Sequence, residues 1–239
     1  MIDRIAPTRR PIGKNDGTQI WESLLFCHWE VSAAALRDLV PPELKIDTFD
    51  GKAYIATVPF RMRAIRPRWL PSALAFNFFE TNVRTYVVHN NRPGVYFFSL
   101  DASSRLAVWA ARTGWALPYY FATMAGSQRD GSYVYESRRD SGVQHFVEFQ
   151  KSNRIGVSPP GTLEHFLFER YLLFVKRRQK ILVGQVHHSP YEVFDAKIKR
   201  MEGGLIRAAG IDLSDELPDL AHFSPGVSVE VFGIRDAIC

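Results

Sequence analysis

Four polar side chains that could take part in chemistry alternate along one short stretch of the sequence. Glu80, Asn82, Arg84 and Tyr86 occupy every second position, and every second side chain of a β-strand lies on the same face. Neighbours two residues apart on a strand are separated by about 7 Å, so an acid, an amide, a guanidinium and a phenol would form one polar row. This row would be ordinary on a solvent-facing strand, whereas inside a barrel it would be a ligand site. The pattern alone leaves both alternatives open.

The enclosed and the exposed alternatives give these side chains different roles. In an enclosed site, Glu80 would act as a general acid or base or accept a hydrogen bond from a ligand, and Arg84 would hold a carboxylate or phosphate. On the surface, the two residues would form an ion pair worth well under ~1 kcal/mol. Phe79, Val83 and Val87 lie on the opposite face and are apolar enough to pack beneath a helix outside a barrel. They favour a row that faces the interior, where a charge is costly unless a partner or ligand satisfies it.

Searches for established catalytic and cofactor motifs give a negative result. The sequence contains no GxGxxG, P-loop lysine or GxSxG motif, so no cofactor is expected. The seven histidines and two cysteines show no HxxxH, HxH or CxxC spacing, which predicts that there is no metal site. Cys27 and His28 are adjacent on a predicted strand, as are His187 and His188, so the members of each pair point to opposite faces and cannot easily act together.

The length and composition indicate a cytoplasmic globular protein. The 239 residues suffice for one large β-barrel domain or two small domains, and a hydrophobic share of 46% provides for a sizeable core. No apolar run approaches ~20 residues, so neither a membrane-spanning helix nor a membrane partner is expected. The N-terminus lacks the apolar segment of a signal peptide, and two cysteines make no disulfide framework, so both features fit a reducing cytoplasm.

The basic residues do not indicate a nucleic-acid partner. The net charge is a mild +5, and the basic residues are spread along the chain. Two denser clusters could hold phosphates or could be solvated loops, but no helix-turn-helix, RNP or zinc-finger pattern accompanies them. The clusters are Arg61, Arg63, Arg66 and Arg68, and Lys176, Arg177, Arg178 and Lys180.

Most of the chain is predicted to form strands, interrupted by a few short helices. The order lacks a strict βαβα rhythm, so we predict a mainly β (α+β) fold, an antiparallel barrel or sandwich with peripheral helices. We expect one domain over residues 1–239, with residues 1–18 as a flexible or loosely packed segment. Helices are expected at 33–40 after the cap Ser32, at 105–113 before Gly114, and from Thr162. Turns are expected at Asp50-Gly51, Asn90–Gly94 and 129–131, and strands at 20–29, 53–60, within 76–102, and at 119–124, 133–137, 144–150, 181–187 and 227–234.

Several long blocks of the sequence resemble the DUF2071 (YqjF-like) family of uncharacterised bacterial proteins. The likeness runs from about Trp21 to Met124 and continues more thinly to the C-terminus. That family is similar in turn to the acetoacetate decarboxylase superfamily, which implies a closed antiparallel barrel or cone around a ligand cavity. The family itself implies no established reaction. The blocks are WESLLFCHWEV, PPEL, DGKAYIATVPFRMR, FFETNVRTYV, PGVYFFSLDA, AARTGWALPYYFATM and LEHFLFERYLLF.

The resemblance to acetoacetate decarboxylase also bears on chemistry. The block that carries the Schiff-base lysine in that enzyme matches AARTGWALPYY here, so that Arg112 matches its arginine and Pro118 its proline. Tyr119 and Tyr120 then stand where the two lysines would be. A Schiff base needs a primary amine, so the resemblance supports the fold and argues against a Schiff-base decarboxylase. Glu80 matches the active-site glutamate of the superfamily.

These inferences define the candidate site. The expected catalytic residues are Glu80, Arg112 and Tyr119, and the expected partner is a small polar or anionic metabolite of unknown identity. Arg112 could instead cap carbonyl groups near a helix end, and the two tyrosines could be packing residues. Any reaction would be lysine-independent acid–base chemistry of a lyase or isomerase type. The alternatives are a ligand-binding sensor, or a structural or interaction barrel filled by side chains, and assembly into a homo-oligomer stays open. The expected ligand-binding residues are Asn82, Arg84, Tyr86 and Tyr120.

Overall fold

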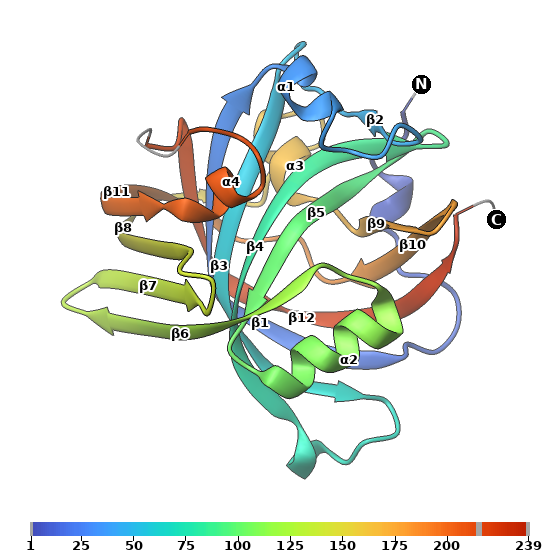
Figure 1. Ribbon diagram of the computed structural model, residues 1–239, viewed down its shortest axis with the longest axis horizontal. Coiled ribbons are helices and arrows are strands. Elements are labelled where there is room, and N and C mark those ends of the chain that lie inside the picture. Colours follow the sequence, from blue (N-terminus) through green and yellow to red (C-terminus); the bar gives the residue numbers. More distant parts are fainter. Residues whose placement is uncertain (1, 214–216, 238–239) are drawn as a thin grey trace.

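The computed structural model describes residues 2–213 and 217–237 and shows a mainly β protein. Of these residues, 57% lie in strands and 14% in helices, which confirms the predicted fold class. The short helices lie around one sheet of twelve strands (Figure 1). The strands are β1 (Gly17–Val31), β2 (Lys45–Ile46), β3 (Ala53–Pro67), β4 (Phe76–His89), β5 (Arg92–Ala102), β6 (Tyr119–Arg129), β7 (Ser132–Arg139), β8 (Gln144–Gly156), β9 (Leu172–Arg177), β10 (Lys180–His187), β11 (Val193–Gly203) and β12 (Leu220–Asp236). The helices are α1 (Ala33–Arg37), α2 (Arg105–Trp115), α3 (Leu163–Phe168) and α4 (Gly204–Ala208), with 3-10 turns at Ala6–Thr8 and Ser72–Leu74.

The sheet branches at two strands and so closes two rings. The order β12-β1-β3-β4-β5-β9-β10 returns to β12 and forms the ring that we call the barrel. A second ring closes through β6, β7, β8 and β11, which connect β5 back to β12. We call these four strands the arm, and in Figure 1 they lie on the left, opposite β9 and β10. Most pairings are antiparallel as predicted, but β5 pairs in parallel with both β6 and β9. The sheet branches at β5 through these two parallel pairings, and at β12 through antiparallel pairings with β10 and β11.

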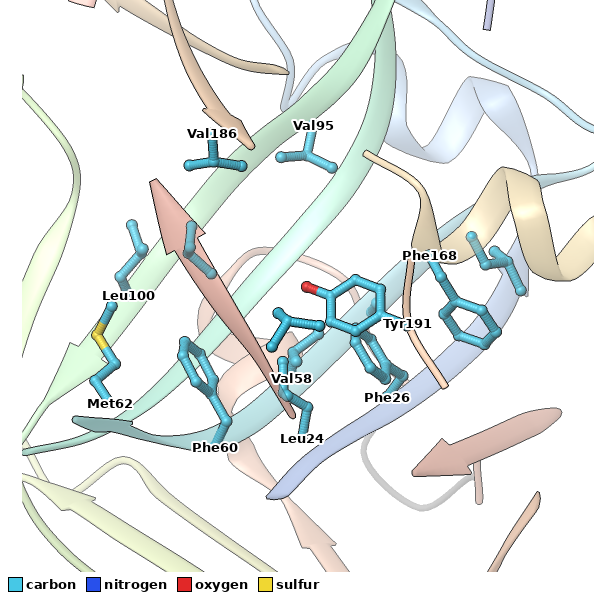
Figure 2. Close-up of a cluster of buried hydrophobic side chains, with 14 of the residues drawn as sticks. Leu24, Phe26, Val58, Phe60, Met62, Val95, Leu100, Phe168, Val186 and Tyr191 are labelled. Carbon is cyan, nitrogen blue, oxygen red and sulfur yellow. The ribbon is translucent and has the colours of Figure 1, made fainter. Parts of the chain in front are cut away.

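Strands β1, β3 and β4 separate two hydrophobic cores, because alternate side chains point to opposite faces. One face points into the barrel, where Leu24, Phe26, Val58 and Phe60 meet apolar side chains from the strands across it (Figure 2). The other face was predicted to pack beneath a helix. In the structure it packs against strands of the arm as well as against α1 and α4. This second core contains Leu25, Val83, Val87, Leu36, Tyr135, Phe149, Leu205 and Ile206.

Several local sequence signals are confirmed. The Ser32 hydroxyl accepts a hydrogen bond from the Ala35 amide, 3.1 Å away, and so caps α1. Thr162 caps α3 in the same way, and Gly51 and Gly131 adopt positive φ at the predicted turns. In each case the signal depends on residues that are close together in the sequence, which is why the sequence alone could identify it.

Several boundaries differ from the prediction: α1 ends at Arg37 rather than at 40, and most strands are longer than predicted. Helix α2 passes through Gly114 and ends at Trp115, where Ala116 takes the left-handed conformation. The hairpin turns at Asn90 and Asn91, both with positive φ, so that the predicted turn residue Gly94 lies inside β5. A Cβ on Gly94 would lie 2.6 Å from the Leu172 carbonyl oxygen, so this glycine allows the close approach of β9. Most of the arginine-rich segment, Arg61 to Arg66, belongs to strand β3 rather than to a loop. Strands β2, β9 and β11 were not predicted.

The N-terminal segment is anchored by arginines. The sequence predicts a flexible or loosely packed segment over residues 1–18, whereas β1 already begins at Gly17. Arg4 forms a two-pronged ion pair with the buried Asp47, at 2.6 and 2.8 Å, and Arg10 pairs with Glu230. These contacts hold the segment against the barrel. No helix within the described residues is long and apolar enough to span a membrane.

Candidate functional site

The polar row on β4 is enclosed. Glu80, Asn82 and Arg84 are 3%, 5% and 9% exposed, and Tyr86 is fully buried. Tyr86 belongs to the same core as the inward-facing residues of β1 and β3, so the row lies along the inner wall of the barrel. The enclosed alternative is therefore confirmed, and the surface ion pair is wrong: Glu80 and Arg84 lie four residues apart on the strand and form no ion pair with each other.

Glu80 and Tyr119 form a hydrogen-bonded pair. The Tyr119 hydroxyl on β6 donates to Glu80 Oε2 over 2.7 Å, and Asn82 supplies a second side-chain hydrogen bond to the same carboxyl group. Burial is the main cause that raises the pKa of Glu80 to about 7; the nearby negative charge of Asp101 also raises it, and the two hydrogen bonds lower it. Tyr119 thus holds a carboxyl group that exchanges its proton near neutral pH.

A buried ion pair that the sequence did not indicate lies next to this pair. Arg139 on β7 donates to both carboxylate oxygens of Asp101 on β5, with a shortest distance of 2.6 Å. From the sequence, Asp101 could equally precede α2 as a cap, but Ser104 performs that role. Burial raises the pKa of Asp101 and the pairing with Arg139 opposes this. Since 38 residues separate the partners, only the fold brings them together.

Arg84 has a different environment from the other buried arginines. Its guanidinium donates to the Leu167 carbonyl, 3.3 Å from Nη2, and to the Tyr86 hydroxyl, and it lies over the rings of Phe26 and Tyr86 at 5.5 and 5.8 Å. Within the described residues no carboxylate pairs with it, and its Nε–H has no hydrogen-bond partner. The site thus contains a buried positive charge without an internal counter-ion.

Two buried histidines lie close enough to Arg84 for its charge to act on them. His28 Nε2 is 2.8 Å from the Tyr86 hydroxyl, which in turn donates to the Leu167 carbonyl over 3.0 Å. His188 stacks on Tyr171, with ring centroids 4.4 Å apart. Burial is the main cause that lowers the pKa of His188 to about 4 and that of His28 well below its ordinary value, and the positive charge of Arg84 contributes to both shifts. Both rings are therefore neutral at pH 7. Neither was singled out as a site residue, because a lone histidine on a strand carries no spacing signal.

Arg112 and Tyr120 lie outside the row. Alternation along β6 places Tyr119 inward, so Tyr120 points outward and is 40% exposed. The Arg112 guanidinium lies near the Tyr120 ring, and its Nε donates to the Tyr119 carbonyl over 2.6 Å. Arg112 is exposed and holds the backbone of β6 through this bond, so the structure does not bring it to Glu80. The structure brings together Glu80, Asn82, Arg84, Tyr86 and Tyr119.

Within the described residues, the interior contains no lysine and no group of metal ligands. All eight lysines of the sequence lie among the described residues, and each is exposed. Within the same residues, no three His, Cys, Asp or Glu side chains gather closely enough to hold a metal ion. Cys27 is a buried free thiol whose pKa burial raises to about 12, and Cys239 lies outside the described residues.

Solved structures with a similar fold include enzymes. The enduracididine biosynthesis enzyme MppR, complexed with pyruvate, superposes with a TM-score of 0.65 at 12% identity, covering 95% of this chain and 93% of that chain. Acetoacetate decarboxylase from Legionella pneumophila gives a TM-score of 0.60 at 10% identity, covering 98% and 94%. At these identities the likeness shows a shared fold, that of acetoacetate decarboxylase.

Sequence comparison gives a more specific relationship. The profile of DUF2071, described as an uncharacterized conserved protein, matches residues 18–228. The protein YqjF of Bacillus subtilis is 36% identical over 223 residues, which cover 91% of this chain and 90% of that protein. A match of this length and identity extends through both rings of the sheet. The chain belongs to the DUF2071 family.

Proposed function

We propose that the barrel binds a small carboxylate-bearing metabolite, with Arg84 as the group that holds the carboxylate. The observation that carries this proposal is the absence of a counter-ion at Arg84 among the described residues. Three arginines are buried within the described residues: Arg84, Arg139 and Arg170. Arg139 pairs with Asp101 and Arg170 pairs with Asp47, whereas Arg84 pairs with no carboxylate.

Electrostatics give the reason why this difference indicates a ligand. A charge inside a protein carries a desolvation penalty of several kcal/mol unless an opposite charge or sufficient hydrogen bonds compensate for it. At Arg84 the protein supplies one carbonyl, the Tyr86 hydroxyl and two aromatic faces, but no negative charge. A carboxylate would supply the missing charge and accept from Nε–H, in the geometry that guanidinium groups favour. The pyruvate in the MppR structure supports a small acid as the kind of ligand this fold accommodates.

The Glu80–Tyr119 pair favours acid–base chemistry on the bound molecule. A carboxyl group with a pKa of about 7 is half-protonated at neutral pH, which suits it to accept or donate a proton. Such a reaction would belong to a lyase or isomerase type that needs no amine. With every lysine exposed, a Schiff base inside the barrel has no group to form it.

A second candidate function is a structural or interaction barrel whose lumen is filled by side chains. The close packing of aromatic rings inside the barrel favours it: the Phe26 ring lies 5.1 Å from that of Phe168 and 5.4 Å from that of Tyr191 (Figure 2). Under this alternative the charge of Arg84 would serve no ligand. The two candidates therefore differ in whether small acids bind.

Titration calorimetry with pyruvate and propionate distinguishes them. We expect the wild-type protein to bind both acids, and Arg84→Met to bind them roughly 10- to 100-fold more weakly, because a charged hydrogen bond is lost. Arg138→Met is the matched control, since Arg138 is exposed on the neighbouring β7; it should bind like wild type. Equal affinities for wild type and Arg84→Met, or no binding by wild type, would contradict the proposal and favour the filled barrel.

The lack of an interior lysine makes a separate prediction about acetoacetate. Borohydride reduction in the presence of acetoacetate should trap no adduct, and the protein should release no carbon dioxide from acetoacetate above background, because Tyr119 cannot form an imine. Mass spectrometry of the intact protein checks the first expectation. A specific adduct on any lysine would show that an amine reaches a substrate, and would overturn the match of Tyr119 and Tyr120 to the lysine positions.

A further inference from the structure

The hydrogen-bonding groups around Arg84 contain information about the rest of the ligand. Nη2 of Arg170 and Nδ1 of His222, next to Tyr86 and Phe168, have no partner within the described residues. Five further buried polar atoms in this part of the barrel also have none, and they bear on the ligand. Two of these five are donors and three are acceptors. The atoms are Nε of Arg84, Nε1 of Trp21, Nδ1 of His28, Nε2 of His188 and Oδ1 of Asn82.

The His188 ring presents a bare acceptor to the interior. Its Nδ1 lies 2.7 Å from the Ser189 carbonyl oxygen, and a carbonyl can only accept, so Nδ1 carries the proton. The ring is neutral at pH 7, because its pKa lies at about 4. Nε2 therefore has a lone pair and no proton. It is buried and has no donor among the described residues.

His28 and Asn82 present two further acceptors. The single proton of the Tyr86 hydroxyl goes to the Leu167 carbonyl, so the contact between Tyr86 and His28 requires a proton on His28 Nε2. Nδ1 of the neutral His28 ring is then a bare acceptor. Asn82 uses its amide group to donate to Glu80, which leaves its carbonyl oxygen without a donor.

The unpartnered donors suit a carboxylate. Nε–H of Arg84 and Nε1–H of Trp21 can only donate, and the Trp21 ring lies 5.7 Å from that of His188. A carboxylate accepts from donors of this kind, and at Arg84 it would also supply the missing charge. It cannot serve the acceptors of His188, His28 and Asn82, which require an O–H or N–H on the ligand.

We propose that the acid bound at Arg84 is a hydroxycarboxylate, recognised by its carboxylate at Arg84 and by its hydroxyl proton at His188 or Asn82. This inference rests on the proposed function and specifies its ligand class. A 2-oxo or 3-oxo acid offers only acceptors, so its carbonyl would leave those acceptors unsatisfied. A site built to accept a hydrogen bond discriminates strongly against an analogue that lacks the donor.

Matched acids test the inference on the wild-type protein. The panel contains lactate, pyruvate and propionate, and also 3-hydroxybutyrate, acetoacetate and butyrate, so that each series differs only in a hydroxyl, a carbonyl or a methylene. We expect the hydroxy acid of at least one series to bind about ten-fold or more tightly than its oxo counterpart, as measured by calorimetry. Two series are needed because they place the hydroxyl at different distances from the carboxylate.

His188→Phe identifies the acceptor, since it keeps a flat ring on Tyr171 and removes both nitrogens. If His188 receives the hydroxyl proton, the preference for the hydroxy acid falls to about one, while affinity for propionate or butyrate stays within two-fold of wild type. A preference that survives His188→Phe and is lost in Asn82→Leu assigns the hydroxyl to Asn82 instead.

The outcomes that overturn the inference are distinct from those that overturn the proposed function. An oxo acid that binds as tightly as its hydroxy counterpart in both series refutes the hydroxycarboxylate and leaves the carboxylate site standing. A hydroxy-acid preference that survives both variants also refutes the assignment. No binding of any of the six acids by wild type refutes the carboxylate site itself. The wild-type comparison decides these points even if a variant fails to fold.

Discussion

Asp101→Ala is expected to lower the free energy of unfolding by about 3–5 kcal/mol. The change leaves the Arg139 guanidinium, which is 8% exposed, without the carboxylate that accepts its three hydrogen bonds. An uncompensated buried charge is among the most destabilising consequences of a single substitution. Urea unfolding at pH 7, followed by circular dichroism, measures the difference.

Two controls separate this effect from a general sensitivity to losing an aspartate. Asp140→Ala removes a carboxylate from an exposed pair with Arg105, in which the two side chains are 75% and 72% exposed, and should change stability by less than about 1 kcal/mol. The double variant Asp101→Leu with Arg139→Met removes both charges and should recover most of the stability. A loss below about 1 kcal/mol for Asp101→Ala would show that Arg139 finds solvent or another partner.

The second large effect concerns the pH dependence of stability at Glu80. The folded-state pKa of about 7 lies above the ordinary value of 4.5, so between these values the folded protein keeps a proton that the unfolded chain releases. The contribution of Glu80 to stability is therefore complete below pH 4.5 and is lost as the pH rises through 7, by about 3 kcal/mol in total. Glu80→Gln carries no titrating group and should lack this loss.

The free energy of unfolding of Glu80→Gln is compared with that of wild type at each pH, because other buried groups titrate in both proteins. Denaturant unfolding of wild type and Glu80→Gln at pH 4.5, 6 and 8 should give a stability difference that shifts in favour of the variant by about 3 kcal/mol over this range. For the control Glu136→Gln, at an exposed position of β7, the free energy of unfolding should change with pH as it does for wild type. If Glu80→Gln also showed the pH dependence of wild type, the Glu80 carboxyl group would be solvated in the folded protein.

The sequence predicts well those features that depend on neighbouring residues. Alternation along 76–89 identifies strand β4 and the shared face of Glu80, Asn82 and Arg84, since the period of two is fixed by strand geometry. The burial of this polar row was predicted because the opposite face of the strand is apolar and because a buried charge is costly unless it serves a site. The structure confirms that the row is buried. Tyr119 was identified only through the resemblance to the acetoacetate decarboxylase superfamily.

Features that depend on the closure of the sheet could not be predicted in this way. The partners in the Asp101–Arg139 pair are 38 residues apart, and the Leu167 carbonyl that Arg84 contacts is 83 residues from it. The second ring arises because β5 and β12 each pair with different strands at their two ends. No periodicity in the sequence shows which strands will meet. His188 reaches the interior for the same reason, through the pairing of β10 with β9 and β12.

A crystal structure of the wild-type protein with propionate tests the carboxylate site most directly. Propionate carries the carboxylate and no other polar group, so its position does not depend on the hydroxyl group of the proposed hydroxycarboxylate. We expect density for its carboxylate inside the barrel, within about 3 Å of Arg84 Nε. Density at Arg84 that fits only water or protein side chains, with propionate absent from the barrel or bound elsewhere, would contradict the account.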